Sequence, residues 1–176
     1  MELRPLVWFA VALAVAVAQT PLFPSPALSQ TMAPQTLAQF LTGALSVATL
    51  QARASEMILT RDATPEVKGF AENVLSFRRN HIAQIESLAN ERGVKVASEP
   101  TFEQRVILQN LEPLNFLALS RRYAEMQVEG LEFELLTYEK TAAVADAALK
   151  GFAAEWQPQL AQQLGDARKM LDASRR

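Results

Sequence analysis

Three glutamates, Glu125, Glu129 and Glu132, have the spacing that most clearly suggests chemistry. Separated by four and three residues, they fall on one face of a helix and form a carboxylate stripe. Carboxylate oxygens bind divalent cations, so a weak metal site is one interpretation, provided that a second helix supplies further oxygen ligands. The candidates for those ligands are Glu72, Glu86 and Asp166. The commoner interpretation is a solvated helix face whose acids pair with nearby Arg or Lys side chains.

The chain has a single histidine, His81, and no cysteine. Metal-binding helical bundles commonly use the spacing Glu-x-x-His, which puts both ligands on one helix face. Three positions before His81 stands Arg78, a cation, so this pair of ligands is missing. Because Arg79 and Asn80 stand directly before it, His81 is expected on the polar side of its helix, as a surface residue rather than a ligand. A two-metal carboxylate centre of the usual kind is therefore not predicted.

Signatures of catalysis and of nucleic-acid binding are also missing from the sequence. No serine can be assigned to a nucleophile–base pair, and the 6 glycines are scattered singly rather than gathered in a phosphate loop. Removal of Glu2 and Arg4 with the N-terminal segment would reduce 17 basic and 19 acidic residues to 16 and 18. Nucleic-acid binders carry a basic excess instead. The sequence thus favours a protein that is not an enzyme, needs no cofactor and binds no nucleic acid.

Aromatic residues recur at the spacing of a helical core. They are Phe70, Phe77, Phe116, Tyr123, Phe133, Tyr138, Phe152 and Trp156. At this spacing we expect them to pack together rather than to line a ligand site. A bundle can still hold an apolar ligand between its helices, which would require a cavity of about 300 Å³ or more.

The elements that must position these residues are all helical. Apolar residues recur every three to four positions, alanine and leucine are prominent, and no strand-like alternation occurs. The pattern predicts long helices over residues 36–61, 65–93, 114–143 and 146–173, and a short helix over 102–111. Thr64 and Pro65 are typical of a helix start, and Gly93 of a helix end. We expect an all-α fold, an antiparallel four-helix bundle with a short extra helix in the middle connection.

The first 29 residues have the features of a secretory signal peptide. Arg4 precedes an unbroken apolar run over residues 6–18, and Ala27-Leu28-Ser29 offers small residues for cleavage. The run of 13 residues is too short for a membrane span, which needs about 20. We therefore expect a periplasmic or secreted protein cleaved near Ser29, without a membrane span after cleavage. A linker over residues 30–35 and a bundle domain over 36–173 would follow.

Several short motifs, taken in order, resemble those of a known family. Thr64-Pro65-Glu66-Val67-Lys68-Gly69-Phe70-Ala71 is similar to the "SPEVKAFA" signature that opens the second helix of an exported bacterial family. That family is domain-of-unknown-function family 4142, which is related in fold to the ferritin-like bundles. The resemblance continues over about residues 37 to 172, through Ser87-Leu88-Ala89, Arg122-Tyr123, Tyr138-Glu139-Lys140 and Gly151-Phe152-Ala153-Ala154. It implies a ferritin-like bundle.

The resemblance also implies histidines at three positions where this chain has other residues. Many members of the family carry histidine at the positions of Arg78, Leu131 and Gln163, and His81 is not equivalent to the first. An acidic residue often found in the first helix falls near Arg53. If members bind metal through those histidines, this chain has lost that ability. Arg78 would then place a fixed positive charge where a cation would otherwise lie.

Together these features predict an exported, ferritin-like bundle with a binding or structural role in the bacterial envelope. Two alternatives from other classes stay open. One is a metal-binding protein that uses Glu125, Glu129 and Glu132, and the other is a carrier of a small apolar ligand. The sequence identifies no partner, and an exposed apolar helix face could equally form a homodimer contact.

Overall fold

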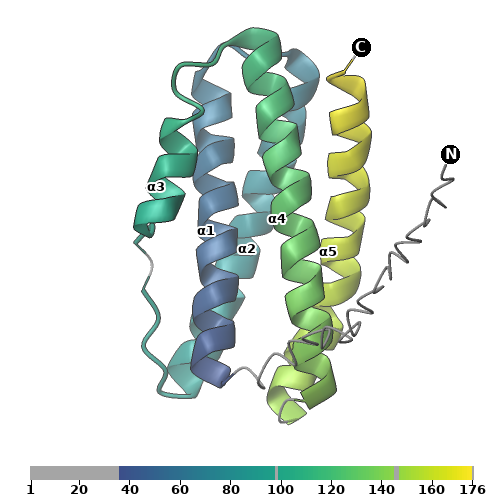
Figure 1. Cartoon of the computed structure of the whole chain (residues 1–176). Coiled ribbons are helices and arrows are strands. Elements are labelled where there is room, and N and C mark those ends of the chain that lie inside the picture. The colour runs from purple at the N-terminus through teal and green to yellow at the C-terminus, as the bar shows by residue number, and fades with distance from the viewer. Residues whose placement is uncertain (1–35, 98, 145–146, 176) are drawn as a thin grey trace, which may run out of the picture. The chain divides into compact units, whose positions relative to one another are not determined.

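Five helices and no strands make up the part of the chain that this computed structural model describes, residues 36–97, 99–144 and 147–175 (Figure 1). They are α1 (Leu37–Thr60), α2 (Pro65–Glu91), α3 (Phe102–Gln109), α4 (Phe116–Val144) and α5 (Ala147–Ala173). The predicted all-helical class is confirmed, and each predicted boundary lies within two residues of these bounds. No described helix has the length and hydropathy to cross a membrane. The predicted signal peptide and linker lie outside the described residues.

Side-chain caps define where three of the helices begin. Thr36, Thr64 and Thr101 each accept a hydrogen bond from the backbone N–H three residues later. Pro65 occupies the first turn of α2, where a backbone N–H has no partner within the helix. Gly93 follows α2 with a φ of 65°, the left-handed conformation that favours glycine. The start and end signals predicted for α2 are therefore confirmed.

Helix α4 begins two residues later than the sequence predicts. Leu114 and Asn115 remain in the loop, and Phe116 opens the helix with a φ of 39°. The N–H of Phe116 donates to the Asp62 carbonyl at 2.7 Å, and the Arg61 guanidinium donates to the Leu114 carbonyl at 3.0 Å. These bonds tie the loop before α4 to the turn between α1 and α2, which explains the later start.

The four long helices pack as two pairs, α1 with α2 and α4 with α5, while α1 also packs on α4 and α2 on α5 (Figure 1). A short turn over residues 61–64 joins α1 to α2, whereas a long connection over residues 92–115 leads from α2 to α4. That connection contains α3, the predicted extra helix. Helix α3 lies against α1, where Gln104 Nε2 donates to the Ser46 carbonyl at 2.6 Å.

The core between the helices is rich in aromatic side chains, as predicted. The rings of Phe40 and Tyr138 lie 4.9 Å apart, and those of Phe77 and Trp156 lie 5.7 Å apart, both edge to face. Phe133 and Phe116 depart from the prediction, because their side chains are 62% and 46% exposed. For Phe133 the reason is geometric: Glu134 faces the interior, and its neighbour in the helix is turned about 100° away from it. Phe116 is the first residue of α4, so no earlier turn of that helix covers it.

Candidate functional site: a buried polar cluster

A cluster of polar side chains lies in the interior of the bundle. Gln51 comes from α1, Arg78 and His81 from α2, and Glu134 and Tyr138 from α4. None of them is more than 1% exposed. The two α2 residues are three positions apart and the two α4 residues four apart, so each pair projects from one helix face. These five residues are called the buried cluster below.

The surface position predicted for His81 is wrong. The side chain is fully buried, although Arg79 and Asn80 before it are exposed. Along a helix, neighbouring residues point in different directions, and positions three apart share a face. His81 therefore follows Arg78 into the interior, whereas the polar residues between them face solvent.

Arg78 is at the centre of the buried cluster. Its Nη2 lies 2.7 Å from Glu134 Oε2 and also donates to Gln51 Oε1, and its Nη1 lies 3.0 Å from His81 Nδ1. The guanidinium thus contacts acceptors from three different helices. Because arginine stays protonated in proteins, burying it requires a counter-charge. The Glu134 carboxylate supplies that charge.

Arg78 also determines where His81 carries its proton. A guanidinium can only donate, so His81 Nδ1 accepts and the ring proton is on Nε2. Nε2 then donates to Tyr138 Oη at 2.7 Å. Burial, assisted by the charge of Arg78, lowers the pKa of His81 to about 2, so the ring is neutral. The 3.6 Å contact between His81 Nδ1 and Glu134 Oε1 is therefore a contact between two acceptors and not an ion pair.

Glu134 is incompletely satisfied by its neighbours. Its Oε2 is within ion-pair distance of Arg78, but neither carboxylate oxygen takes part in a well-directed hydrogen bond. The side-chain amide of Gln127 is also buried without a partner. Burial raises the pKa of Glu134, and the positive charge of Arg78 opposes this rise. We take Glu134 to be ionised at neutral pH, since it is the counter-charge of a permanent cation.

Helix α5 closes the buried cluster with aromatic rings. Trp156 stacks on His81, with ring centroids 4.1 Å apart and planes 28° from parallel, and the Phe152 ring lies 6.2 Å from His81. Stacking against an apolar ring removes water from the imidazole, which contributes to the low pKa. Both His81 nitrogens are engaged and the ring is covered, so the geometry suits a fixed structural group better than a general base.

Gly130 of α4 makes room for the side chain of Gln51. A Cβ atom at position 130 would collide with the Gln51 amide. That amide cannot move freely, because its Nε2 donates to the Gln127 carbonyl at 3.3 Å and its Oε1 accepts from Arg78. The close approach explains a glycine within a helix, where it costs about 1 kcal/mol relative to alanine.

We expect Gly130→Ala to lower the free energy of unfolding by about 1–3 kcal/mol, because the new methyl group overpacks the core against Gln51. Urea unfolding of the two proteins measures the change. Gly69→Ala is the matched control, since nothing lies within 4 Å of a Cβ atom there. This control is expected to gain up to about 1 kcal/mol from helix propensity. A similar gain in both variants would contradict the steric role of Gly130.

Comparison with known proteins decides the family of the chain. Residues 23–170 match the model of the family described as Domain of unknown function (DUF4142). The chain belongs to this family. The resemblance found in the motifs of the sequence is thereby confirmed at the level of the family. No curated protein and no solved structure matched the chain.

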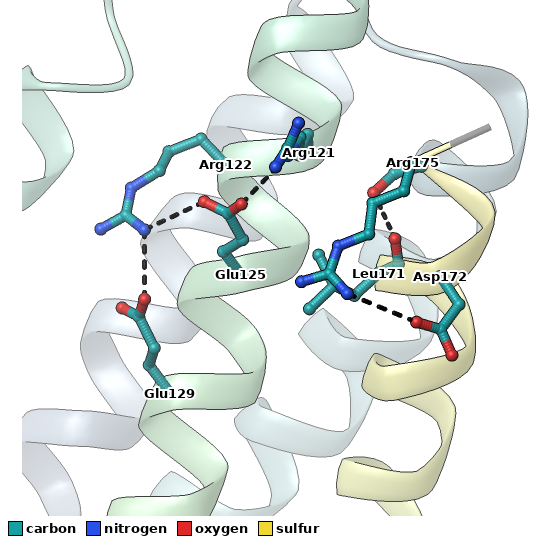
Figure 2. A network of polar contacts seen from close by, with 8 residues as sticks. Arg121, Arg122, Glu125, Glu129, Leu171, Asp172 and Arg175 are labelled. Atoms are coloured by element: carbon teal, nitrogen blue, oxygen red, sulfur yellow. Dashed lines mark hydrogen bonds and ion pairs between the residues drawn. The ribbon is translucent and has the colours of Figure 1, made fainter.

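In this DUF4142 chain the predicted carboxylate stripe is paired with arginines (Figure 2). Arg122 Nη1 lies 3.3 Å from Glu125 Oε2 and 3.2 Å from Glu129 Oε1, and Arg121 Nε donates to Glu125 at 3.1 Å. Figure 2 shows these side chains on the outer side of α4. Ion pairing of this kind is what the solvated-face interpretation describes.

Glu132, the third member of the stripe, pairs with a different helix. It accepts a hydrogen bond of 2.7 Å from Arg168 of α5 and is about half exposed. Asp166, a candidate second-helix ligand, lies 2.9 Å from Lys169. In residues 36–97, 99–144 and 147–175, no group of three or more His, Asp or Glu side chains is placed to hold a metal ion.

The three positions at which the family resemblance implies histidine lie in two different settings. Arg78 and Leu131 are buried, whereas Gln163 lines a surface groove between α2 and α5. This groove has a volume of about 390 Å³, and Phe70 is the single predicted core aromatic among its lining residues. It is therefore unlike the aromatic-lined cavity that an apolar-ligand carrier would require.

Sequence reasoning missed two members of the buried cluster, Gln51 and Glu134, and also the buried Gln127, whose carbonyl accepts from Gln51. A signal for Glu134 was present, because it lies three residues after the apolar Leu131 and four before Tyr138, an aromatic predicted to pack in the core. Helical periodicity alone thus placed this carboxylate in the core. Its role was hidden because acidic side chains are seldom fully buried unless they are paired.

Proposed function

We propose that this DUF4142 protein is an exported, non-catalytic helical bundle with a binding or structural role in the bacterial envelope. In its interior the guanidinium of Arg78 takes the place of a metal ion. One observation supports this most directly: Arg78 contacts Gln51 Oε1, His81 Nδ1 and Glu134 Oε2, which come from three helices. Oxygen and imidazole nitrogen are the donors that metal ions use, and a fixed cation among them repels a second one.

The proposed architecture is an antiparallel, ferritin-like bundle. A short turn after α1 lets α2 fold back along it, and α4 and α5 follow one another closely in the chain. One long connection, over residues 92–115, separates the two pairs. A single long crossover between two helical hairpins is the connectivity of ferritin-like folds. Helix pairing in Figure 1 agrees with this arrangement.

A non-catalytic role is supported by the way the ionisable groups of the buried cluster bind one another. Glu134 is the counter-charge of Arg78, and His81 is neutral and bonded through both nitrogens. A general acid or base must reach a substrate proton. Export rests on the apolar run over residues 6–18 and on the small residues that end at Ser29.

The full chain, produced in a bacterium and released by osmotic shock, tests both parts of this proposal. The intact mass shows whether cleavage has occurred near Ser29. After loading with iron, manganese and zinc and then desalting, we expect less than roughly one ion per ten chains by mass spectrometry. About one retained ion per chain would overturn the metal-free interior. An uncleaved chain confined to the cytoplasm would overturn export.

Arg78→Ser tests whether the guanidinium occupies a cation site. The variant removes the guanidinium but keeps His81, Glu134 and Gln51 as donors, so we expect Zn²⁺ to bind and to raise Tm. Arg78→Lys is the matched control, because lysine retains a positive charge and should show no response to zinc. Equal responses of the two variants, or no response of Arg78→Ser, would contradict the assignment of this site.

A further inference from the structure

A small crevice between α1 and α4 reaches the buried cluster from the surface. It has a volume of about 50 Å³. Gly43, Ala44 and Val47 of α1 form one side, and Phe133 of α4, largely exposed, stands on the other. Glu134 and Tyr138 also line it, although both are members of the buried cluster. The crevice is therefore a place where a molecule from solvent could meet a buried carboxylate.

Glu134, which lines this crevice, has an unused acceptor oxygen. The side chain is only 1% exposed, and its Oε2 is taken by Arg78. Its Oε1 has no hydrogen-bond partner, and the nearest polar atom of His81, Nδ1, is an acceptor and cannot donate to it. Leaving a buried charged oxygen without a donor is unfavourable. A ligand that brings a donor would relieve this cost.

The charges around the crevice determine whether its ligand should be cationic, anionic or neutral. Arg78 already balances Glu134, and His81 beside them is neutral. A second cation in the crevice would have no counter-charge of its own, whereas an anion would be repelled by the carboxylate. A neutral molecule with an N–H or O–H group avoids both penalties.

Size restricts the ligand further. A cavity needs at least about 10–15 Å³ to admit one water, whose share of liquid volume is about 30 Å³, so the crevice has room for only a few waters or a molecule of a few heavy atoms. The side chains of Val47 and Phe133 offer apolar contact to a methyl or methylene group. A short amide or alcohol has both the donor and the apolar part.

We propose that the α1–α4 crevice binds a small neutral molecule of this class, a primary amide or an alcohol, with Glu134 Oε1 as the acceptor. The proposal rests on the metal-free interior proposed above, because Arg78 rather than a metal must balance Glu134. The ligand-binding proposal and the metal-free-interior proposal can be contradicted by different results. A protein that retains no metal and ignores small amides contradicts this proposal alone, whereas metal retention contradicts the earlier one.

Three probes of equal size but different charge test the proposal: acetate, acetamide and acetamidinium. Each is titrated into the full chain, as purified above, and backbone amide shifts of Val47 and Thr137 are followed by NMR. We expect saturable shifts with acetamide alone, at a Kd on the order of 1 mM for so few atoms. Absence of saturation with acetamide overturns the proposal, and tighter binding of acetamidinium overturns the neutral class.

Gly43→Leu closes the crevice without disturbing Glu134. Nothing lies within 4 Å of a Cβ atom at Gly43, so a side chain can begin there without a clash, and we expect leucine to fill the opening. Gly69→Leu is the matched control, since Gly69 is equally unobstructed but lies on α2, outside the crevice. We expect at least a tenfold loss of acetamide affinity in Gly43→Leu and no change in Gly69→Leu. Unchanged affinity in Gly43→Leu would overturn the location of the site.

Discussion

Replacing Glu134 by leucine is expected to lower the free energy of unfolding by about 3–5 kcal/mol, because Arg78 would stay buried without its counter-charge. Most of this loss comes from the stranded guanidinium rather than from the missing contact itself. The double variant Arg78→Met/Glu134→Leu removes both charges. It is therefore expected to regain most of the stability, since an apolar pair of similar volume often replaces a buried ion pair without loss.

Urea unfolding of the wild type, both single variants and the double variant gives the interaction energy through a double-mutant cycle. The exposed pair Arg168–Glu132, at 2.7 Å, is the matched control with the same distance but solvent around it. Its cycle is expected to yield less than about 1 kcal/mol. Similar interaction energies for the buried and exposed pairs would contradict the central role given to burial.

A second large effect is expected on lowering the pH, and it arises from His81. In the unfolded chain this histidine titrates near 6.5, whereas burial, aided by Arg78, holds its folded pKa at about 2. Between these values the unfolded state binds one more proton than the folded state. Stability is therefore fully present above pH 6.5 and falls by about 1.4 kcal/mol for each unit below it.

The charged and titratable groups around His81 determine how clearly this slope is seen. Arg78 stays charged, and the pKa of Tyr138 is raised by burial, so Tyr138 stays neutral in acid. Burial also raises the pKa of Glu134, so between pH 4.5 and that raised pKa the folded state binds more protons at Glu134 than the unfolded state does. In this range protonation of Glu134 stabilises the folded state as the pH falls, which offsets part of the loss of stability caused by His81.

Comparison with His81→Gln isolates the histidine, because His81 is the only histidine in the chain and glutamine does not titrate. Chemical unfolding of both proteins between pH 7.5 and 4.5 measures the difference in their stabilities. We expect that difference to shrink by about 2–3 kcal/mol over the range, in the direction of lost wild-type stability. Parallel stability curves would show that His81 is protonated in the folded protein, contrary to its bonds with Arg78 and Tyr138.

The helices of this protein could be predicted from sequence because their signals are local. Thr64 and Pro65 start α2 and Gly93 ends it through backbone geometry that depends on a few neighbouring residues. The family could likewise be inferred from short motifs. The late start of α4 at Phe116 could not, because it depends on bonds from Arg61 and to Asp62, far away in the sequence.

The site was harder to predict because its residues are defined by partners on other helices. His81 was assigned to the surface from its neighbours in sequence, although its position relative to Arg78 fixes its direction. Arg78 itself is buried only because Glu134 of α4 neutralises it. A sequence shows each of these side chains as polar but not the pairing that permits burial. Phe133 and Glu134 illustrate the same point, since the apolar residue is exposed and the acid beside it is buried.

The sharing of Arg78 among α1, α2 and α4 has a consequence for how the helices can slide along one another. Successive residues of a helix are separated by about 1.5 Å along its axis. A slip of α2 past α4 by one helical turn, about 5.4 Å, would carry the 2.7 Å contact between Arg78 and Glu134 beyond hydrogen-bond length. Leucine and alanine contacts elsewhere in the core resist such a slip far less selectively. The guanidinium therefore fixes the axial register of the three helices relative to one another.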